Sequence, residues 1–95
     1  MSLFNLKDKS ILITGSSRGI GKAIAKHCAM HGANVIISSR KEDACIETAN
    51  EINSLVGEDL AYPIAASISN TDQLELLVSK TREKYGKIDG LVNNA

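Results

Sequence analysis

The chain has 95 residues, of which 43% are hydrophobic and 23% are charged, values typical of one small globular domain. Eleven basic residues balance eleven acidic ones, so no surplus of one sign is available to attract nucleic acid or an anionic membrane. No apolar run approaches the roughly 20 residues that cross a bilayer, and Met1 to Lys9 lacks the apolar segment of a secretory signal, so we expect a cytoplasmic protein.

The first part of the chain pairs a short apolar run with a longer helical stretch. Ser10 to Thr14 is apolar rather than alternating, which predicts a strand buried on both faces. A glycine-rich segment follows, and then Ile20, Ile24 and Cys28 recur every four residues, which predicts a helix with this stripe toward the core. Gly32 stands where a glycine that ends a helix belongs. Small residues of the same helix allow close packing: Ala23, Ala25 and Ala29.

The same alternation continues through the middle of the chain. Asn34 to Ser39 predicts a second buried strand, and Glu42 to Val56 predicts a second helix. Leu60 to Ala65 predicts a weaker third strand, in which Pro63 favours the edge of a sheet because proline cannot donate to the strand ladder. The expected inner face of the second helix consists of Cys45, Ala49, Ile52 and Val56.

A third helix and a fourth strand complete the pattern. Asn70 or Thr71 can cap a helix that runs to Tyr85, with Gly86 as its stop. Ile88 to Asn93 then begins a strand. The expected inner face of the third helix consists of Leu74, Leu77, Val78, Thr81 and Tyr85.

The order β-α-β-α-β-α-β predicts the α/β class with a doubly wound parallel sheet of the Rossmann type. With right-handed crossovers, the first four strands are expected in the order 3-2-1-4. We treat residues 1–95 as one such domain, incomplete at its C-terminal end. A crevice for a ligand is expected between strands 1 and 4, outside the carboxyl ends of the strands.

The segment from Thr14 to Gly21, T-G-S-S-R-G-I-G, connects the first strand to the first helix. Gly15 permits a tight turn off the strand, Gly19 lets the backbone approach a pyrophosphate, and Gly21 lets the helix pack closely. The free N–H groups at the start of the helix would then face the phosphates. The segment therefore predicts a phosphate site, and the alternative is a glycine turn that binds nothing.

Two other phosphate-binding motifs fit the glycine segment poorly. Its spacing is G-x-x-x-G-x-G, whereas the dinucleotide fingerprint is G-x-G-x-x-G. A P-loop requires Ser or Thr to ligate Mg²⁺ at the position that Ala23 occupies. Hydrolysis of a nucleoside triphosphate is therefore disfavoured.

T-G-S-S-R-G-I-G resembles the T-G-x-x-x-G-x-G signature of classical short-chain dehydrogenases/reductases. Asn93-Asn94-Ala95 resembles the start of that family's N-N-A-G element, so the resemblance spans the chain from Phe4 onward. It implies a nicotinamide dinucleotide and hydride transfer with a small-molecule carbonyl or alcohol substrate. The family's catalytic Ser, Tyr, Lys and a further Asn lie beyond N-N-A-G, so no catalytic residue is assigned. Tyr62 and Tyr85 are not in a Y-x-x-x-K motif.

Basic residues favour NADP(H) over NAD(H) as the cofactor. An acid about 20 residues past the glycine loop holds the ribose of NAD, but here the second strand ends in Ser39, followed by Arg40. A hydroxyl and a guanidinium suit a 2′-phosphate, and Arg18 resembles the second basic position of NADP-preferring members. Glu42 and Asp43 fit better as first-turn acids of the second helix.

The resemblance also implies contacts with the adenosine end of the cofactor. Ser67-Ile68 occupies the place of the family's Asp-Val or Asn-Val, a departure that leaves only a hydroxyl to accept a hydrogen bond there. Asn94 resembles the residue that borders the adenosine ribose, whereas we expect Asn93 to be structural. The complete set of expected cofactor residues is Gly15, Ser17, Arg18, Gly19, Ile20, Gly21, Ser39, Arg40, Ser67, Ile68 and Asn94.

No metal site is expected. His27 and His31 have the i, i+4 spacing of zinc ligands, but no third ligand accompanies them, and histidines suit the last turns of a helix. Cys28 and Cys45 lie on apolar stripes without a C-x-x-C pairing, so we expect both to be core residues without redox function.

Two further hypotheses remain beside the oxidoreductase. One is a non-catalytic module that senses or buffers NADP(H), and the other is a truncated chain without activity of its own. The enzyme and the binding module differ in whether sequence beyond Ala95 supplies the catalytic Tyr and Lys. We expect the complete protein to form a homo-oligomer without a nucleic-acid or membrane partner.

Overall fold

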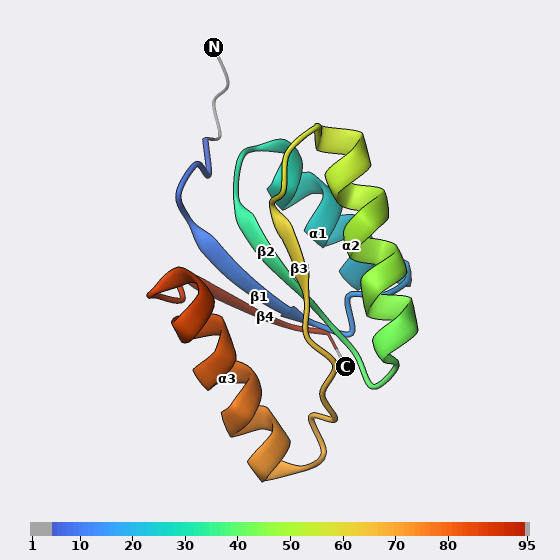
Figure 1. The fold of residues 1–95 in the computed structure, drawn as a ribbon, viewed down its shortest axis with the longest axis vertical. Coiled ribbons are helices and arrows are strands. Elements are labelled where there is room, and N and C mark those ends of the chain that lie inside the picture. Colours follow the sequence, from blue (N-terminus) through green and yellow to red (C-terminus); the bar gives the residue numbers. More distant parts are fainter. Residues whose placement is uncertain (1–4, 95) are drawn as a thin grey trace.

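The computed structural model describes residues 5–94, so Phe4 and Ala95 lie outside the described part (Figure 1). Its four strands form one parallel sheet in the order β3-β2-β1-β4, which confirms the predicted class and strand order. The elements are β1 (Ser10–Thr14), α1 (Gly19–Met30), β2 (Asn34–Ser38), α2 (Glu42–Val56), β3 (Ala61–Pro63), α3 (Thr71–Tyr85) and β4 (Gly90–Asn93).

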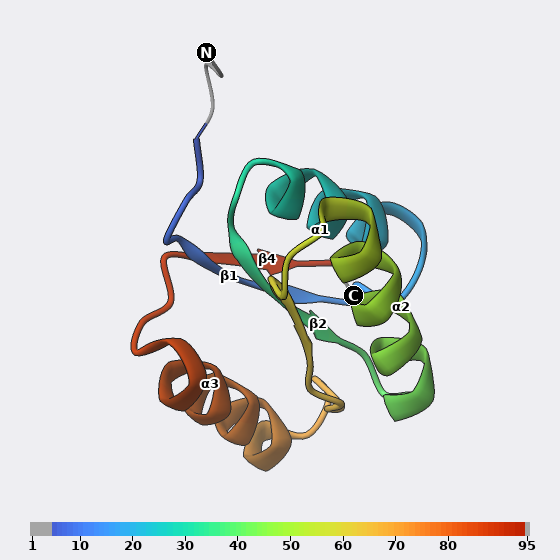
Figure 2. The same ribbon diagram turned by 45° about the horizontal axis from the view of Figure 1, so that its top comes forward.

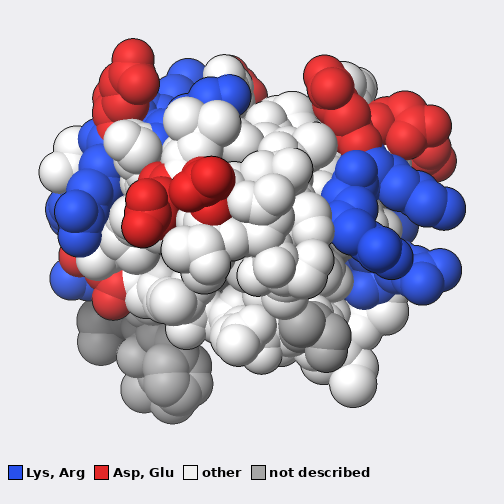
Figure 3. Space-filling view, turned by 90° about the horizontal axis from the view of Figure 1, so that it is seen from below, with Lys and Arg blue, Asp and Glu red and all other residues white. Residues whose placement is uncertain are grey.

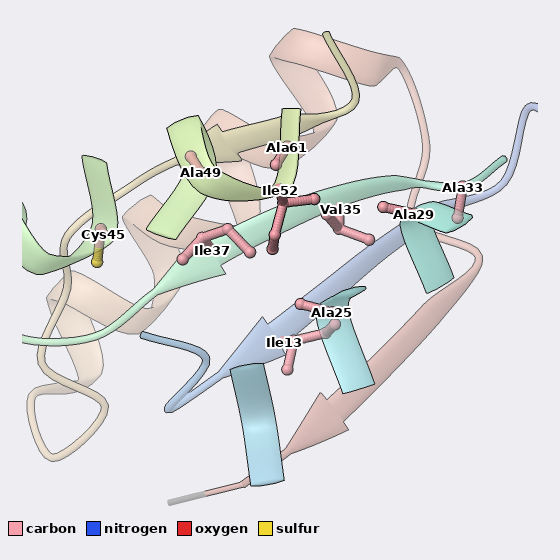
Figure 4. Close-up of a cluster of buried hydrophobic side chains, with 10 residues drawn as sticks. All are labelled: Ile13, Ala25, Ala29, Ala33, Val35, Ile37, Cys45, Ala49, Ile52 and Ala61. Atoms are coloured by element: carbon pink, nitrogen blue, oxygen red, sulfur yellow. The ribbon is translucent and has the colours of Figure 1, made fainter. Parts of the chain in front are cut away.

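Helices cover both faces of the sheet, α1 and α2 on one face and α3 on the other (Figures 1 and 2). Alternate residues of the central strands point to opposite faces, as the pleat requires. Val35 and Ile37 pack with α1 and α2, whereas Ile36 packs with Leu77 of α3. Figure 4 shows the first cluster, in which small alanine side chains of both helices lie on one side of β1 and β2. Strands buried on both faces explain the continuous apolar runs of the sequence.

The inner face of α1 differs from the predicted stripe. Gly21, Ala25 and Ala29 are the buried residues of the helix, and Ile20 is 72% exposed. Ile24 and Cys28 are half-buried and pack against the core from its margin. The prediction that Cys28 is a buried core residue is therefore wrong. The reason is steric, since only a face without long side chains brings the helix axis close to the sheet.

The short strands β3 and β4 differ from their predicted bounds. Pro63 lies in the edge strand as expected, and β3 covers three residues of the predicted Leu60 to Ala65. The fourth strand begins at Gly90, two residues later than predicted, because Asp89 joins β1 through its side chain as well as its backbone. The second strand ends at Ser38, one residue before Ser39.

Asp89 stabilises the pairing of β4 with β1. Its Oδ2 accepts the Ser10 N–H at 2.8 Å and lies 3.4 Å from Lys87 Nζ. The hydrogen bond from Ser10, aided by Lys87, lowers the pKa of the Asp89 carboxyl against the opposing effect of desolvation. A carboxyl with a lower pKa in the folded state stabilises the fold above its unfolded pKa, and this stabilisation is lost as the pH falls through the folded pKa.

The free energy of unfolding of the wild type should decrease as the pH falls below about 4, the unfolded pKa of aspartate. We therefore expect a smaller decrease in Asp89→Asn. Urea unfolding of wild type and variant between pH 6 and pH 3 measures this directly. The variant should be less stable at neutral pH and approach the wild type in acid. An unchanged difference in free energy across this range would contradict the assignment.

Candidate functional site

The segment from Gly15 to Arg18 connects β1 to α1 at the carboxyl ends of the strands. Asn94, which follows β4, reaches it through Nδ2, which donates to the Gly15 carbonyl at 3.4 Å. On the other side, the Ser16 N–H donates to the Ser38 carbonyl at the end of β2, at 3.1 Å. The segment, called the glycine loop below, thus lies against the ends of both neighbouring strands, where the sheet topology predicted a crevice.

The start of α1 is left without the partners that the other helices have. No side chain of the described residues caps α1, and no acidic residue lies in its first turn. In contrast, Asn70 accepts a hydrogen bond from the Gln73 N–H at the start of α3, and Glu42 and Asp43 lie in the first turn of α2 as predicted. The positive end of the α1 dipole and its first N–H groups therefore remain available to an anion.

Gly19, the first residue of α1, faces open space. Its φ of +63° lies in the left-handed region, which side chains other than glycine adopt with strain. A Cβ added at this position would have no heavy atom within 4 Å among the described residues. The backbone of the helix start is thus accessible from outside, as a site for a phosphate group requires.

Gly15 in the glycine loop and Gly21 in the first turn of α1 are both enclosed. A Cβ at Gly15, whose φ is also positive, would collide with the Asn94 carbonyl oxygen. A Cβ at Gly21 would collide with the Gly15 carbonyl oxygen and lie 2.7 Å from Asn94 Nδ2. Gly21 therefore lets α1 approach the loop and the end of β4, in addition to the sheet contact expected from the sequence.

A network of side chains at the end of β1 fixes Asn94. Thr14 Oγ1 accepts the Asn94 N–H at 3.0 Å and donates to Asn93 Oδ1 at 3.1 Å. Both the backbone and the side chain of Asn94 are thereby held against β1 and the glycine loop. Asn94 thus lies beside the glycine loop, and Ala95 lies outside the described residues.

Ser16 is a positioning residue that the sequence analysis missed. Its side chain is fully buried, and Oγ donates to the Ile13 carbonyl at 2.7 Å and accepts the Ser38 N–H at 2.8 Å. These bonds fix the turn of the glycine loop to β2. The neighbouring Ser38 hydroxyl is buried and has no hydrogen-bond partner in the described part of the chain. A buried hydroxyl without a partner is costly, so a polar ligand at this edge of the sheet fits the residues present.

The predicted residues after β2 lie next to the glycine loop because Ser16 ties the loop to Ser38. Ser39 is half-buried, and its Oγ accepts the Lys41 N–H at 3.3 Å and lies 3.2 Å from Cys45 Sγ. Arg40 and Arg18 are exposed, and neither forms an ion pair with a described residue. Both guanidinium groups are therefore available to an anionic ligand.

The segment after β3 adjoins the same edge. The Ala66 N–H donates to the Ser39 carbonyl at 2.9 Å, which places Ser67 beside the end of β2. The Ser67 N–H donates to Gln73 Oε1 at 2.7 Å, and its hydroxyl lies 2.9 Å from Ser69 Oγ. Ser67 thus already has partners in Gln73 of α3 and in Ser69 of its own loop, and Ile68 beside it is half-buried.

The two tyrosines lie away from the glycine loop. Tyr85 ends α3 and packs against the cluster of Leu12 and Ile36. Burial, with smaller contributions from Asp59 and Tyr62, raises the pKa of Tyr85 to about 12, so its hydroxyl stays protonated at neutral pH. Tyr62 lies in the edge strand with Lys84 Nζ 4.6 Å from its ring centre.

A separate hollow of about 650 Å³ lies between α2, β3 and α3. Its charged lining consists of Glu42, Glu83, Lys80 and Lys84, which balance one another, and Tyr62 and Ile64 supply apolar surface. No residue of the glycine loop lines it. This hollow therefore lies away from the uncapped start of α1.

The positive charges on the molecular surface are grouped in separate places. On the face seen in Figure 3, Lys and Arg side chains gather on two opposite sides, and mostly uncharged surface separates them.

Residues 5–94 contain no group of three His, Cys, Asp or Glu side chains arranged to hold a metal ion, and His31 Nδ1 lies 2.9 Å from the His27 carbonyl. None of the described helices has the length and apolar character needed to cross a membrane.

Known proteins resemble this chain in sequence and in fold. A family model described as short chain dehydrogenase matches residues 9–95. The L-rhamnose 1-dehydrogenase (NAD(P)(+)) of Azotobacter vinelandii is 39% identical over 94 residues, which cover 95% of this chain and 36% of that protein.

Two solved structures with bound cofactor are similar. The L-sorbose reductase of Gluconobacter frateurii, complexed with NADPH and L-sorbose, has a TM-score of 0.91 at 33% identity, over 97% of this chain and 35% of its own. The RhlG/NADP active-site complex of Pseudomonas aeruginosa has a TM-score of 0.87 at 37% identity, over 97% and 36%. The chain therefore spans about a third of the length of the relatives it matches.

Proposed function

The chain belongs to the short chain dehydrogenase family, and from this premise we propose that it forms the cofactor-binding part of an NADP(H)-dependent oxidoreductase acting on a carbonyl or alcohol. The observation that carries the proposal is the uncapped start of α1, with Gly19 facing open space at the carboxyl edge of the sheet. The family predicted from the glycine loop is confirmed. Similar structures hold NADPH or NADP, which supports the same class of cofactor here.

Each part of the crevice has a role in this proposal. The N–H groups of the α1 start hold the pyrophosphate, with Gly19 leaving room for it. Arg18, Ser39 and Arg40 hold the 2′-phosphate through charge-assisted hydrogen bonds. Asn94 and the segment Ser67-Ile68 border the adenosine. A bound nicotinamide would supply or accept the hydride, and the residues of this chain would hold the dinucleotide that carries it.

The proposal is tested by calorimetric titration of the protein with NADP⁺ and with NAD⁺. We expect both to bind, NADP⁺ more tightly, and the difference between them to shrink as salt screens the contact with the exposed Arg18 and Arg40. Failure of both dinucleotides to bind would overturn the proposal. Carbonyl-dependent oxidation of NADPH by the complete protein separates an enzyme from a module that only binds. Homo-oligomeric assembly and a cytoplasmic location stay predictions.

A further inference from the structure

A hydroxyl group of α2 reaches across to the glycine loop. Thr48 Oγ1 donates to the Ser17 carbonyl at 3.0 Å, and the Thr48 side chain is only 3% exposed. From this contact we propose that Thr48 is a positioning residue, which holds the glycine loop in the form that accepts the cofactor pyrophosphate. The inference rests on the proposed function and adds a residue that lies outside the predicted site.

The direction of this hydroxyl group is unusual for a helix interior. Threonine in a helix commonly satisfies its hydroxyl with the carbonyl four residues earlier. Thr81 of α3 does so, since its Oγ1 donates to the Leu77 carbonyl at 2.8 Å while its side chain is fully buried. Thr48 instead donates outside its own helix, to a residue 31 positions away.

The contact fixes the orientation of one peptide unit in the loop. Because a trans peptide is planar, with its C=O and N–H opposed, a Ser17 carbonyl directed at α2 turns the Arg18 N–H away from α2. A Ser17 carbonyl released from Thr48 could rotate toward the crevice, where its negative oxygen would oppose a phosphate. The hydroxyl group therefore excludes a loop conformation unfavourable to an anion.

Ion pairs also hold the helix that carries Thr48 against α1. One turn later, Glu51 Oε2 lies 3.1 Å from Lys22 Nζ and 3.0 Å from Lys26 Nζ of α1. These exposed ion pairs are individually weak, but they join α2 to α1, the helix that follows the glycine loop. Because α2 begins directly after the segment Ser39 to Lys41, one helix supports both the pyrophosphate and the 2′-phosphate regions.

Thr48→Val removes the hydroxyl group at nearly constant volume, and Thr81→Val is the matched control on α3. Hydrogen exchange of the Ser16 and Lys22 amides, which donate to the Ser38 and Arg18 carbonyls, is measured in the ligand-free protein, and affinities for NADP⁺ and NAD⁺ are measured by calorimetry. We expect Thr48→Val to speed exchange and to weaken both dinucleotides by the same factor, about 5- to 10-fold, the loss of one hydrogen bond. Thr48→Ser should restore both quantities, and Thr81→Val should change neither.

The outcomes separate this inference from the proposed function. Wild-type exchange and affinity in Thr48→Val would overturn the positioning role. If the wild type binds neither dinucleotide, the proposed function fails, while the exchange rates in the ligand-free protein still decide whether Thr48 orders the loop. Should Thr48→Val fail to fold, Thr48→Ser and Thr48→Ala make the same comparison with smaller side chains, and equal behaviour of the two would overturn the inference.

Discussion

Gly19→Val is expected to abolish binding of NADP⁺ and NAD⁺ while the protein remains folded. The space in front of Gly19 is open, since an added Cβ has no heavy atom of another part of the fold within 4 Å, and a valine side chain would fill the volume proposed for the pyrophosphate. Its φ of +63° also strains a β-branched residue and shifts the N–H groups of the helix start. Losing two charge-assisted hydrogen bonds corresponds to an affinity decrease of about 100-fold or more.

Gly57→Val is the matched control for this change. Gly57 has a φ of +73° and equally open surroundings, but it ends α2, away from the glycine loop. Both variants should lose similar stability in thermal unfolding, about 1–2 kcal/mol from the left-handed backbone. Calorimetry should then show wild-type affinity for Gly57→Val and no detectable binding for Gly19→Val. Retained affinity in Gly19→Val would show that the glycine loop is not the phosphate site.

Arg40→Asp is expected to reverse the preference between the two cofactors. The exposed guanidinium lies directly after the end of β2, where the proposal places the 2′-phosphate, and no carboxylate of the described residues neutralises it in an ion pair. The substitution removes a charge-assisted contact and adds a carboxylate that repels the 2′-phosphate and suits the free ribose hydroxyl. The ratio of NADP⁺ to NAD⁺ affinity should fall by about 10-fold or more.

Arg82→Asp makes the same change of charge elsewhere. Arg82 lies in the last turn of α3. Because α3 runs antiparallel to the strands that it connects, this turn lies near the amino ends of the strands, whereas the glycine loop lies at their carboxyl ends. Substitution of Arg82 should leave the affinity ratio unchanged, which isolates the local effect of Arg40 from net charge. An affinity ratio that is equal in Arg40→Asp and wild type would remove Arg40 from the cofactor site.

Elements with local signals were predicted closely. The bounds of β1, α2 and α3 follow from a continuous apolar run, from helical periodicity and from the cap at Asn70. The exposure of Ile20 was not predictable in this way. The same four-residue period fits a stripe through Ile20 or one through Gly21, and only the distance between α1 and the sheet decides between them.

The sequence analysis identified the glycines of the candidate site but not the residues that hold the glycine loop in place. Glycines at a strand-to-helix junction have a local meaning, and the structure shows distinct surroundings for Gly15, Gly19 and Gly21. Ser16 and Thr48 act through bonds to residues distant in sequence, which no local pattern specifies. One signal was available for Thr48, because a hydroxyl residue on the same face as Cys45 and Ile52 needs a partner.

The three supports of the glycine loop imply an order of folding. The loop is bound by Ser38, by Thr48 and by Asn94, across 22, 31 and 79 residues respectively. Closing the longest of these loops costs about 1 kcal/mol more chain entropy than closing the shortest. We therefore expect β1, β2 and their two helices to assemble first and β4 to dock afterwards. The wall formed by β4 would then be the last part of the crevice to appear, set against a loop that has already taken its shape.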